Sequence, residues 1–280
     1  MRTFAEYLRD AAKYGTLGKA ALHWQCKQET CSEEEIIQRM HQRLKVMRES
    51  AHAGLSPDLR SVSGMVGGQA SRMIDEKHVN RFGLLGKAGA YALSIAEYNA
   101  CMGKIVAAPT AGSCGILPGA LLSVQEQEGF TDDELVMALF AAAGFGRIIS
   151  LQATISGAEG GCQAECGAAA GMAAAALVEL YGGTAEMAGH ACAFALMNML
   201  GLVCDPVHGL VEVPCVYRNV GGVSQALAAA QMALSGVTSP IPCDEVILAM
   251  KEVGDALPAS LRETGEGGCA ACKSVCKKKN

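Results

Sequence analysis

The spacing of apolar residues along the chain predicts a mostly helical protein. The segment SEEEIIQRMHQRLKVMRES begins at Ser32 and places Glu35 three residues later, which is the spacing of a helix capping box. Its apolar residues recur on one helical face: Ile37, Met40, Leu44 and Met47. This periodicity is typical of a helix that packs one side against a core.

A second capping box, Thr131 with Glu134, opens the apolar segment LVMALFAAAGFG. Further helices are expected at 82–100, 165–181, 185–200, 219–235 and 243–253. Only LVEVPCV, at 210–216, has the character of a β-strand, and one short strand does not make a sheet. We therefore expect an all-α fold, a single Gly- and Ala-rich helical domain over residues 1–280, with no internal repeat or linker.

The composition favours a soluble protein with a large buried core. Of 280 residues, 50% are apolar and 18% are charged. No uninterrupted apolar run reaches the roughly 18 residues that a membrane-spanning helix needs, so we expect no membrane association. The chain has 33 glycines, and such small residues let helix backbones approach closely.

Charge and cysteine content suggest a cytoplasmic protein that does not bind nucleic acid. A net charge of -5 provides no basic surface, and the cationic run Lys277–Lys279 is expected to be solvated. The segment MRTFAEYLRDAAKYG lacks the apolar core of a signal peptide. In a chain that is not exported, 13 cysteines are expected to be reduced thiols and metal ligands rather than disulfides.

Three glycine-rich loops separate the expected helices: SVSGMVGGQAS at 61–71, APTAGSCGILPG at 108–119 and SGAEGGCQAECG at 156–167. Glycine permits positive φ and lets backbone N–H groups approach an anion, so such loops can hold a carboxylate. Tight turns between packed helices are the alternative interpretation. No GxGxxG follows a strand and no Walker A motif is present, which argues against dinucleotide or ATP binding.

Cys204 and Cys215 bracket the segment CDPVHGLVEVPC and lie eleven positions apart. Zinc modules usually pair cysteines two to four residues apart, so these two would reach a common metal centre from separate segments. Cys162, in GGCQAECG, is the candidate third ligand. Iron-sulfur clusters are typically held by cysteines, but these spacings alone do not identify the metal.

The sequence around these cysteines resembles a known family. The stretches SVSGMVGG, APTAGSCGILPG, GCQAECGAAAGMAAAALVELYGG and LGLVCDPVHGLVEVPC followed by RN resemble the catalytic α part of iron-sulfur-dependent L-serine dehydratases, or L-serine ammonia-lyases. The similarity runs from about residue 55 to 265, in order and with matching gaps, and leaves a Cys- and Lys-containing tail at 266–280. It implies a helical catalytic unit that binds a [4Fe-4S] cluster through Cys162, Cys204 and Cys215.

The resemblance also implies a mechanism. One iron of a cluster held by three thiolates lacks a protein ligand and can act as a Lewis acid on the hydroxyl of L-serine. A base then removes the α proton, water leaves, and the aminoacrylate product becomes pyruvate and ammonia. The reaction belongs to amino-acid catabolism and gluconeogenesis. The substrate carboxylate would be held by the two matching loops through Ser61, Ser63, Gly64, Thr110 and Gly112.

The chain departs from the family pattern in two ways. Gln69 stands where an acidic residue often follows the Gly-Gly of the first loop, so a carboxylate role is not expected there. The chain also lacks the Ser-Ser-His-Thr type segment of one-chain members. It therefore resembles the α subunit of the two-chain form, and a separate β subunit in a hetero-oligomer is expected.

The catalytic base and a fourth cluster ligand are less well defined. His208 lies between two proposed ligands and is a weak candidate for the base, against the alternative of a structural histidine. A base on the partner chain is also possible. Cys269, Cys272 and Cys276 lie in the tail, and some relatives use a C-terminal cysteine as a displaceable fourth ligand, for which Cys272 or Cys276 would serve here. The remaining cysteines are expected to be structural: Cys26, Cys31, Cys101, Cys114, Cys166, Cys192 and Cys243.

Other functions remain as alternatives. A pyridoxal-phosphate (PLP) dehydratase needs a Schiff-base lysine, and the only candidate, Lys104, has no motif around it, so no PLP is expected. Cluster-dependent β-elimination from another amino acid, as in an L-cysteine desulfidase or an L-threonine dehydratase, stays open. A purely structural or electron-transfer cluster would be closed by four ligands, whereas three cysteines leave a coordination position open.

Overall fold

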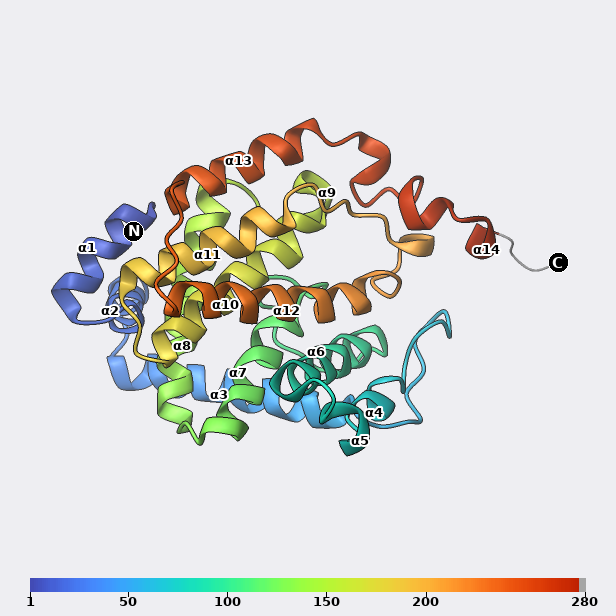
Figure 1. Cartoon of the computed structure of the whole chain (residues 1–280), viewed down its shortest axis with the longest axis horizontal. Helices are drawn as coiled ribbons and strands as arrows, with labels where there is room; N and C mark the ends of the chain where they lie inside the picture. Colours follow the sequence, from blue (N-terminus) through green and yellow to red (C-terminus); the bar gives the residue numbers. More distant parts are fainter. Residues whose placement is uncertain (277–280) are drawn as a thin grey trace.

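The computed structural model describes residues 1–276, and these form helices joined by loops, as Figure 1 shows. An isolated bridge between Cys204 and Arg262 is the nearest approach to a strand in this part of the chain. The all-α expectation is therefore confirmed. The α-helices are α1 (Phe4–Tyr14), α2 (Leu17–Glu29), α3 (Glu33–Ala53), α4 (Ala70–Met73), α5 (Glu76–Val79), α6 (Gly83–Ala100), α7 (Ile116–Glu128), α8 (Asp132–Gln152), α9 (Gly157–Gly160), α10 (Ala168–Leu180), α11 (Ala185–Met199), α12 (Cys215–Leu234), α13 (Cys243–Ala256) and α14 (Lys273–Cys276).

The expected helix starts are largely present. Thr131 and Glu134 form a reciprocal capping box at α8: the Glu134 N–H donates to Thr131 Oγ1 and the Thr131 N–H donates to Glu134 Oε2. At α3 only half of the box forms, with Ser32 Oγ accepting from the Glu35 N–H at 3.2 Å. A π-helical turn, Gln163–Gly167, precedes α10 and carries the third glycine-rich loop into the core.

The segment 210–216, which has the composition of a strand, does not form one. A short 3₁₀ turn, Val207–Gly209, leads into an irregular segment, and α12 begins at Cys215. The backbone groups here bond locally, since the Val207 N–H donates to Val213 O and the Glu212 N–H donates to Leu210 O. Pro214 precedes the first residue of α12 and has no N–H to give to a sheet.

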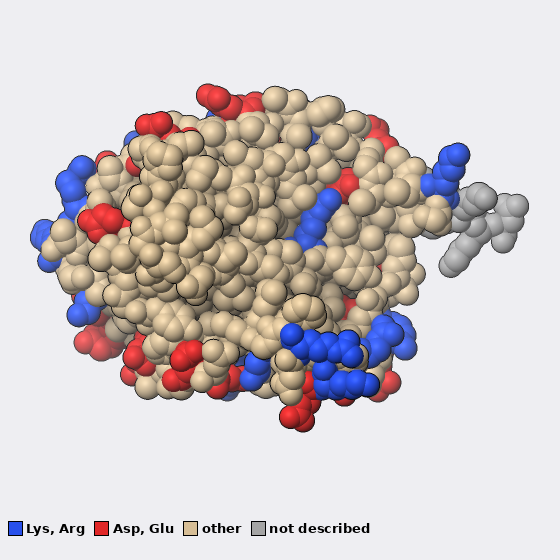
Figure 2. Space-filling model, viewed as in Figure 1, with Lys and Arg blue, Asp and Glu red and all other residues tan. Residues whose placement is uncertain are grey.

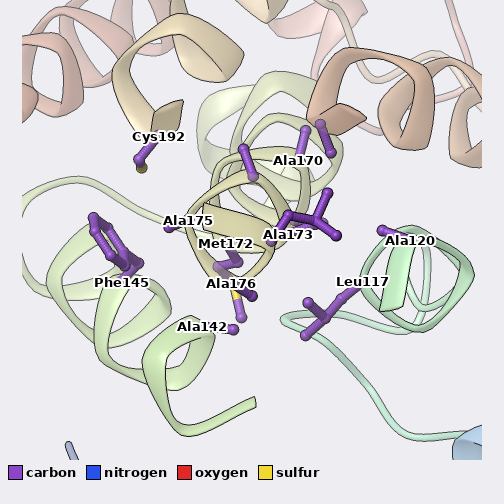
Figure 3. Packing of buried hydrophobic residues seen from close by; sticks show 14 of the residues in the cluster. Leu117, Ala120, Ala142, Phe145, Ala170, Met172, Ala173, Ala175, Ala176 and Cys192 are labelled. Atoms are coloured by element: carbon purple, nitrogen blue, oxygen red, sulfur yellow. The ribbon is translucent and has the colours of Figure 1, made fainter. Parts of the chain in front are cut away.

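Helix α10 lies at the centre of the core. Its sequence is AAAGMAAAALVEL, and its first eleven residues are all buried. Figure 3 shows Ala142 and Phe145 of α8, Leu117 and Ala120 of α7 and Cys192 of α11 arranged around it. A Cβ atom built on Gly171 would lie 3.0 Å from Cys192 Sγ, so α10 and α11 approach closely only because this residue is glycine.

Helix α8 has the length and apolar composition of a membrane-spanning helix, the only one in the described part of the chain to do so. However, 61% of its most apolar stretch is buried within the protein. It packs against α10 and α2 and supplies the buried residues Phe145, Ile148 and Ile149. These contacts are those of a core helix.

The glycine-rich loops and the segment that carries Cys204 gather toward one end of the helical body, on the right in Figure 1, where the tail also leaves it. On the face in Figure 2, charged side chains are sparse over the centre, and Lys and Arg gather near α4 and α5. Arg72, Lys77 and Arg81 belong to these short helices and the turn after them.

Candidate functional site

Three buried cysteines converge from separate segments. Cys162 precedes the π-helical turn, Cys204 follows α11, and Cys215 is the first residue of α12; their exposed fractions are 2%, 4% and 8%. Burial raises the pKa of Cys204, and raises that of Cys215 to about 12, with the charge of Cys162 contributing to both. The charge of Cys162 therefore reaches the other two thiols.

Cys162 has the most acidic thiol of the three. Its Sγ lies 3.3 Å from Cys166 Sγ, within hydrogen-bond range. This hydrogen bond lowers the pKa of Cys162, against the effect of burial, and the Arg218 guanidinium lowers it further. Within the pair, the pKa of Cys166 is raised, so Cys162 is the thiol that ionises first. A thiolate is the form that binds a metal.

The backbone of Cys204 is fixed by the segment that follows α13. The Cys204 N–H donates to Leu261 O at 2.8 Å, and the Glu263 N–H donates to Cys204 O at 2.7 Å. The neighbouring Asp205 accepts a 2.6 Å hydrogen bond from the Cys269 N–H. Contacts from 261–269 therefore set the position of this cysteine, and no local sequence pattern indicates them.

Arg218 and Asp205 form an ion pair beside the cysteines. Arg218 Nη2 lies 2.7 Å from Asp205 Oδ1, and Arg218 Nη1 donates to Val203 O at 2.7 Å. Asp205 Oδ1 is buried and accepts no aligned hydrogen bond from residues 1–276, so its interaction with Arg218 is chiefly that of opposite charges. Arg218 thus links the segment before Cys204 to the first turn of α12.

Glu165 lies between the cysteine segment and the second glycine-rich loop. A Cβ atom built on Gly157 would lie 2.6 Å from Glu165 Oε2 and 3.0 Å from Cys204 Sγ. A Cβ atom built on Gly112 would lie 3.3 Å from Glu165 Oε1. Burial raises the pKa of Glu165, and a hydrogen bond with Thr110 opposes the shift. Two glycines therefore leave room for a carboxyl group beside both Cys204 and the loop.

The first loop is held by Glu212, which lies three residues before Cys215. Glu212 is buried and accepts hydrogen bonds from Ser61 Oγ at 2.6 Å, from the Ser63 N–H at 3.1 Å and from Ser63 Oγ. Gly64 is exposed, with φ of 76°, and its N–H donates to Ser61 O. Both serine hydroxyls predicted to hold the substrate therefore already have a carboxylate partner.

Buried polar side chains also hold the rest of the two loops. Glu97 accepts from the backbone N–H groups of Gly67, Gln69 and Ala70 at 3.0, 2.9 and 3.0 Å. The carboxylate at this loop thus comes from α6, and the Gln69 side chain lies 3.3 Å from the Tyr217 hydroxyl.

In the second loop, Asn219 donates to Gly112 O at 2.8 Å and accepts from the Gly115 N–H at 2.9 Å. The hydroxyls of Thr110 and Ser113 lie 3.1 Å apart. The first turn of α12 therefore positions this loop as well as Cys215.

Several predicted residues lie apart from this cluster. His208 is exposed on the 3₁₀ turn at φ of 58° and makes no side-chain hydrogen bond within residues 1–276. Cys272 is exposed, with its Sγ 3.9 Å from Gly268 O. The side chain of Cys276 lies outside the described residues, as does the run Lys277–Lys279. Lys104 is exposed.

The three cysteines offer sulfur as the donor atom. Within residues 1–276, no group of three or more His, Cys, Asp or Glu side chains is placed to hold a single metal ion. Cys162, Cys204 and Cys215 are nevertheless all buried, and the charge of Cys162 reaches the other two thiols. Thiolate donors of this kind are those that typically hold iron-sulfur clusters.

The residues that sequence reasoning missed are Glu97, Glu165, Asp205, Glu212, Arg218 and Asn219. Most of them stand within a few positions of a cysteine, inside the stretches that carry the family resemblance. These residues could have been found as single charged or amide residues within short, otherwise apolar segments. Such a group is seldom buried without a partner, so its presence there indicates a specific contact.

The chain is similar in sequence to known proteins. The family described as serine dehydratase alpha chain matches residues 8–270. The probable L-serine dehydratase alpha chain of Bacillus subtilis (strain 168) is 50% identical over 243 residues, which are 86% of this chain and 81% of that one. The L-serine dehydratase alpha chain of Peptoniphilus asaccharolyticus is 45% identical over 256 residues, 90% of this chain and 88% of that one. L-serine dehydratase TdcG of Escherichia coli (strain K12) is 42% identical over 188 residues, but these cover only 41% of its length.

Proposed function

Because the chain belongs to the serine dehydratase alpha chain family, we propose that its cysteine site converts L-serine to pyruvate and ammonia. The protein is an L-serine dehydratase, a lyase, and the resemblance found in its sequence is confirmed. One observation carries the assignment to this site: three buried cysteines share it with a carboxyl group that faces a glycine-rich loop.

Cys162, Cys204 and Cys215 are the residues that would hold a [4Fe-4S] cluster. When bound, the cluster would supply a Lewis acid for the serine hydroxyl. The protein contributes a buried setting and a thiol, Cys162, whose pKa is already lowered. Since Cys204 and Cys215 have raised pKa values, these residues would lose their protons on holding the cluster.

Glu165 is the group that we assign as the acceptor of the α proton, in place of His208. Its carboxyl group lies beside Cys204 Sγ and Gly112, whereas His208 is exposed on a turn. The proton on the serine Cα passes to a Glu165 oxygen, and the bond from Cβ to the hydroxyl oxygen breaks as the Cα–Cβ double bond forms. Glu165 then gives this proton to the departing hydroxide, which leaves as water, and the aminoacrylate tautomerises and is hydrolysed to pyruvate and ammonia.

The two glycine-rich loops orient the substrate. The Ser61 and Ser63 hydroxyls are bound to Glu212, so these serines would position the loop rather than contact the carboxylate directly. Thr110 and Gly112 face Glu165 and are the better candidates for substrate contact. Holding serine in register with the base lowers the entropic cost of the reaction.

The chain would work with a separate β chain in the cytoplasm, as a hetero-oligomer without PLP. The alpha chain names of its relatives support such a partner. Elimination from L-threonine or L-cysteine would use the same base and loops. The preferred substrate is therefore determined by comparing turnover of the three amino acids.

The test is a Mössbauer spectrum of the anaerobically reconstituted α chain with its β chain, recorded before and after addition of L-serine. We expect a four-iron signal in which one iron changes on addition of serine, and turnover that is faster with L-serine than with L-threonine or L-cysteine. If all four irons ignored serine in the complete assembly, the dehydratase mechanism at this site would be wrong. Loss of activity on borohydride treatment would instead point to PLP.

A further inference from the structure

A cleft of about 530 Å³ lies between α2, α3 and α8 and borders the second glycine-rich loop on the segment Val106–Pro109. This volume is within the range of about 300 to 1,000 Å³ typical of small-molecule pockets. Apolar side chains form its floor: Ile36, Met47, Leu117, Leu139 and Phe140. The proposed chemistry uses none of these five residues.

Three arginines and one carboxylate line the opening of the cleft. Glu29 is paired with Arg39. Arg43 Nη1 donates to a backbone carbonyl, Arg39 O, at 3.2 Å. Arg147 Nε donates to Met1 O at 3.3 Å, and its guanidinium stacks 3.9 Å from the centre of the Trp24 ring. Within the described residues neither Arg43 nor Arg147 forms a close ion pair with a carboxylate, although the charge of Arg43 acts on Glu29.

We propose that this cleft binds a small carboxylate with an apolar body. The apolar body would cover the floor, and the carboxylate would bind Arg43 and Arg147. Arginine suits this role because its planar guanidinium matches a carboxylate in two parallel hydrogen bonds. The cleft has three arginines and one glutamate, so a ligand with a single negative charge would neutralise part of its excess positive charge. A multivalent anion is strongly hydrated and would fit the apolar floor poorly.

Such a ligand would also act on the serine site. Ala108 and Pro109 line the cleft, and Thr110 and Gly112 follow at once in the same loop, where they face Glu165. A ligand that packs better against one conformation of this loop increases the population of that conformation. Occupancy of the cleft therefore changes the KM for L-serine.

The chain contains one tryptophan, Trp24, and it lines this cleft. Its intrinsic fluorescence therefore reports on the cleft in the full-length α chain without any label. Titration with hexanoate is expected to give a saturable change in fluorescence. The matched probes hexylammonium and hexan-1-ol have the same apolar body but no carboxylate, and neither is expected to saturate at equal concentration.

Substitution of Arg43→Gln is expected to weaken hexanoate binding by about tenfold, the loss of one charge-assisted contact. Arg43 is exposed, so the variant should fold normally. Lys45→Gln is the control. This substitution removes one positive charge from the same helix, but Lys45 lies outside the cleft. Equal binding by the two variants, or saturation with hexan-1-ol at the hexanoate concentration, would overturn the proposal.

A kinetic measurement separates binding from coupling. In the assembled enzyme, saturating hexanoate is expected to change the KM for L-serine at least about twofold, and less so in Arg43→Gln. An unchanged KM despite saturable binding would overturn the coupling through the loop. The fluorescence test does not depend on serine turnover, so its failure is distinct from failure of the proposed dehydratase mechanism.

Discussion

The Ser61 hydroxyl donates a 2.6 Å hydrogen bond to Glu212 Oε2, across 151 residues of sequence. Glu212 lies three residues before Cys215, and it also accepts from the Ser63 N–H at 3.1 Å. The first glycine-rich loop and the segment leading to a proposed cluster ligand are thus fixed to the same carboxylate. A shift in either one moves the other.

Glu212→Gln tests this link. The amide has one acceptor oxygen in place of two, so a buried hydroxyl or N–H loses its partner. We expect the free energy of unfolding to fall by about 1 to 3 kcal/mol, together with a rise in the KM for L-serine. Urea unfolding and steady-state kinetics measure these effects. Glu252→Gln, at an exposed position on α13, is the control, and an equal effect in both variants would contradict the assignment.

Each of the single substitutions Cys162→Ala, Cys204→Ala and Cys215→Ala should abolish stable binding of iron. Loss of one of three thiolates leaves a cluster with two protein ligands. Iron and sulfide content per chain, measured after anaerobic reconstitution, report the result directly. Cys114→Ala removes an equally buried thiol outside the cluster and should keep full iron content. Full iron content in any of the three ligand variants would show that the residue is not a ligand.

Glu165→Gln should lower kcat by about 100-fold or more while the iron content stays unchanged, because the amide cannot accept the α proton. Glu159→Gln, in the same loop, is the matched control, since Glu159 is exposed and bonds to Thr154 at 2.5 Å. The control should keep most of the activity. Similar rates in the Glu165 and Glu159 variants would exclude Glu165 as the base.

The pH dependence of stability should also report on Glu165. Burial raises its pKa above the ordinary 4.5 for glutamate, so folding favours the protonated carboxyl group. Its contribution to stability is therefore full below pH 4.5 and is lost as the pH rises through the raised pKa. In the cluster-free chain, Glu165→Gln should gain stability over the parent at about pH 8 but not at about pH 4.5. A stability difference independent of pH, measured by urea unfolding, would contradict this.

Arg218→Gln should destabilise the chain by about 3 to 5 kcal/mol, because it leaves the Asp205 carboxylate buried without its counter-charge. Asp205 has a side-chain exposure of 3%, and its partner one of 15%. The double variant Asp205→Asn with Arg218→Gln should recover part of the loss, since no charge then remains unpaired. Additive losses in a double-mutant cycle would show that the two side chains act independently.

Local signals account for what the sequence predicted well. The Thr131 box, the Ser32 cap and the apolar periodicity after each lie within a few residues, so they predict α8 and α3 directly. Helices α1, α2 and α7 were not predicted. Thr3 and Thr16 do cap the first two, but those helices are short, and α7 begins in a glycine-rich loop with Pro118 in its first turn. Proline is tolerated there because that turn has no helical partner for its N–H.

The site was less accessible to local reasoning. The grouping of Cys162, Cys204 and Cys215 came from family resemblance, and their spacing alone did not establish it. The Ser61–Glu212 and Gly115–Asn219 contacts join positions more than a hundred residues apart, and no local pattern encodes such pairs. The β character of 210–216 produces no strand, because within the described residues no second strand is available to pair with it.

The alanine-rich helix α10 sets how freely the sequence can change around the site. Burying alanine costs no side-chain rotamer entropy, so this helix gives a stiff centre at little entropic expense. The same close packing leaves no space for another methylene, because α7, α8 and α11 approach it on different sides. Amino-acid substitutions should therefore be tolerated on the outer helices but should destabilise the protein when they fall on α10. The sequence of α10 should change slowly among related proteins, although this helix takes no part in the reaction.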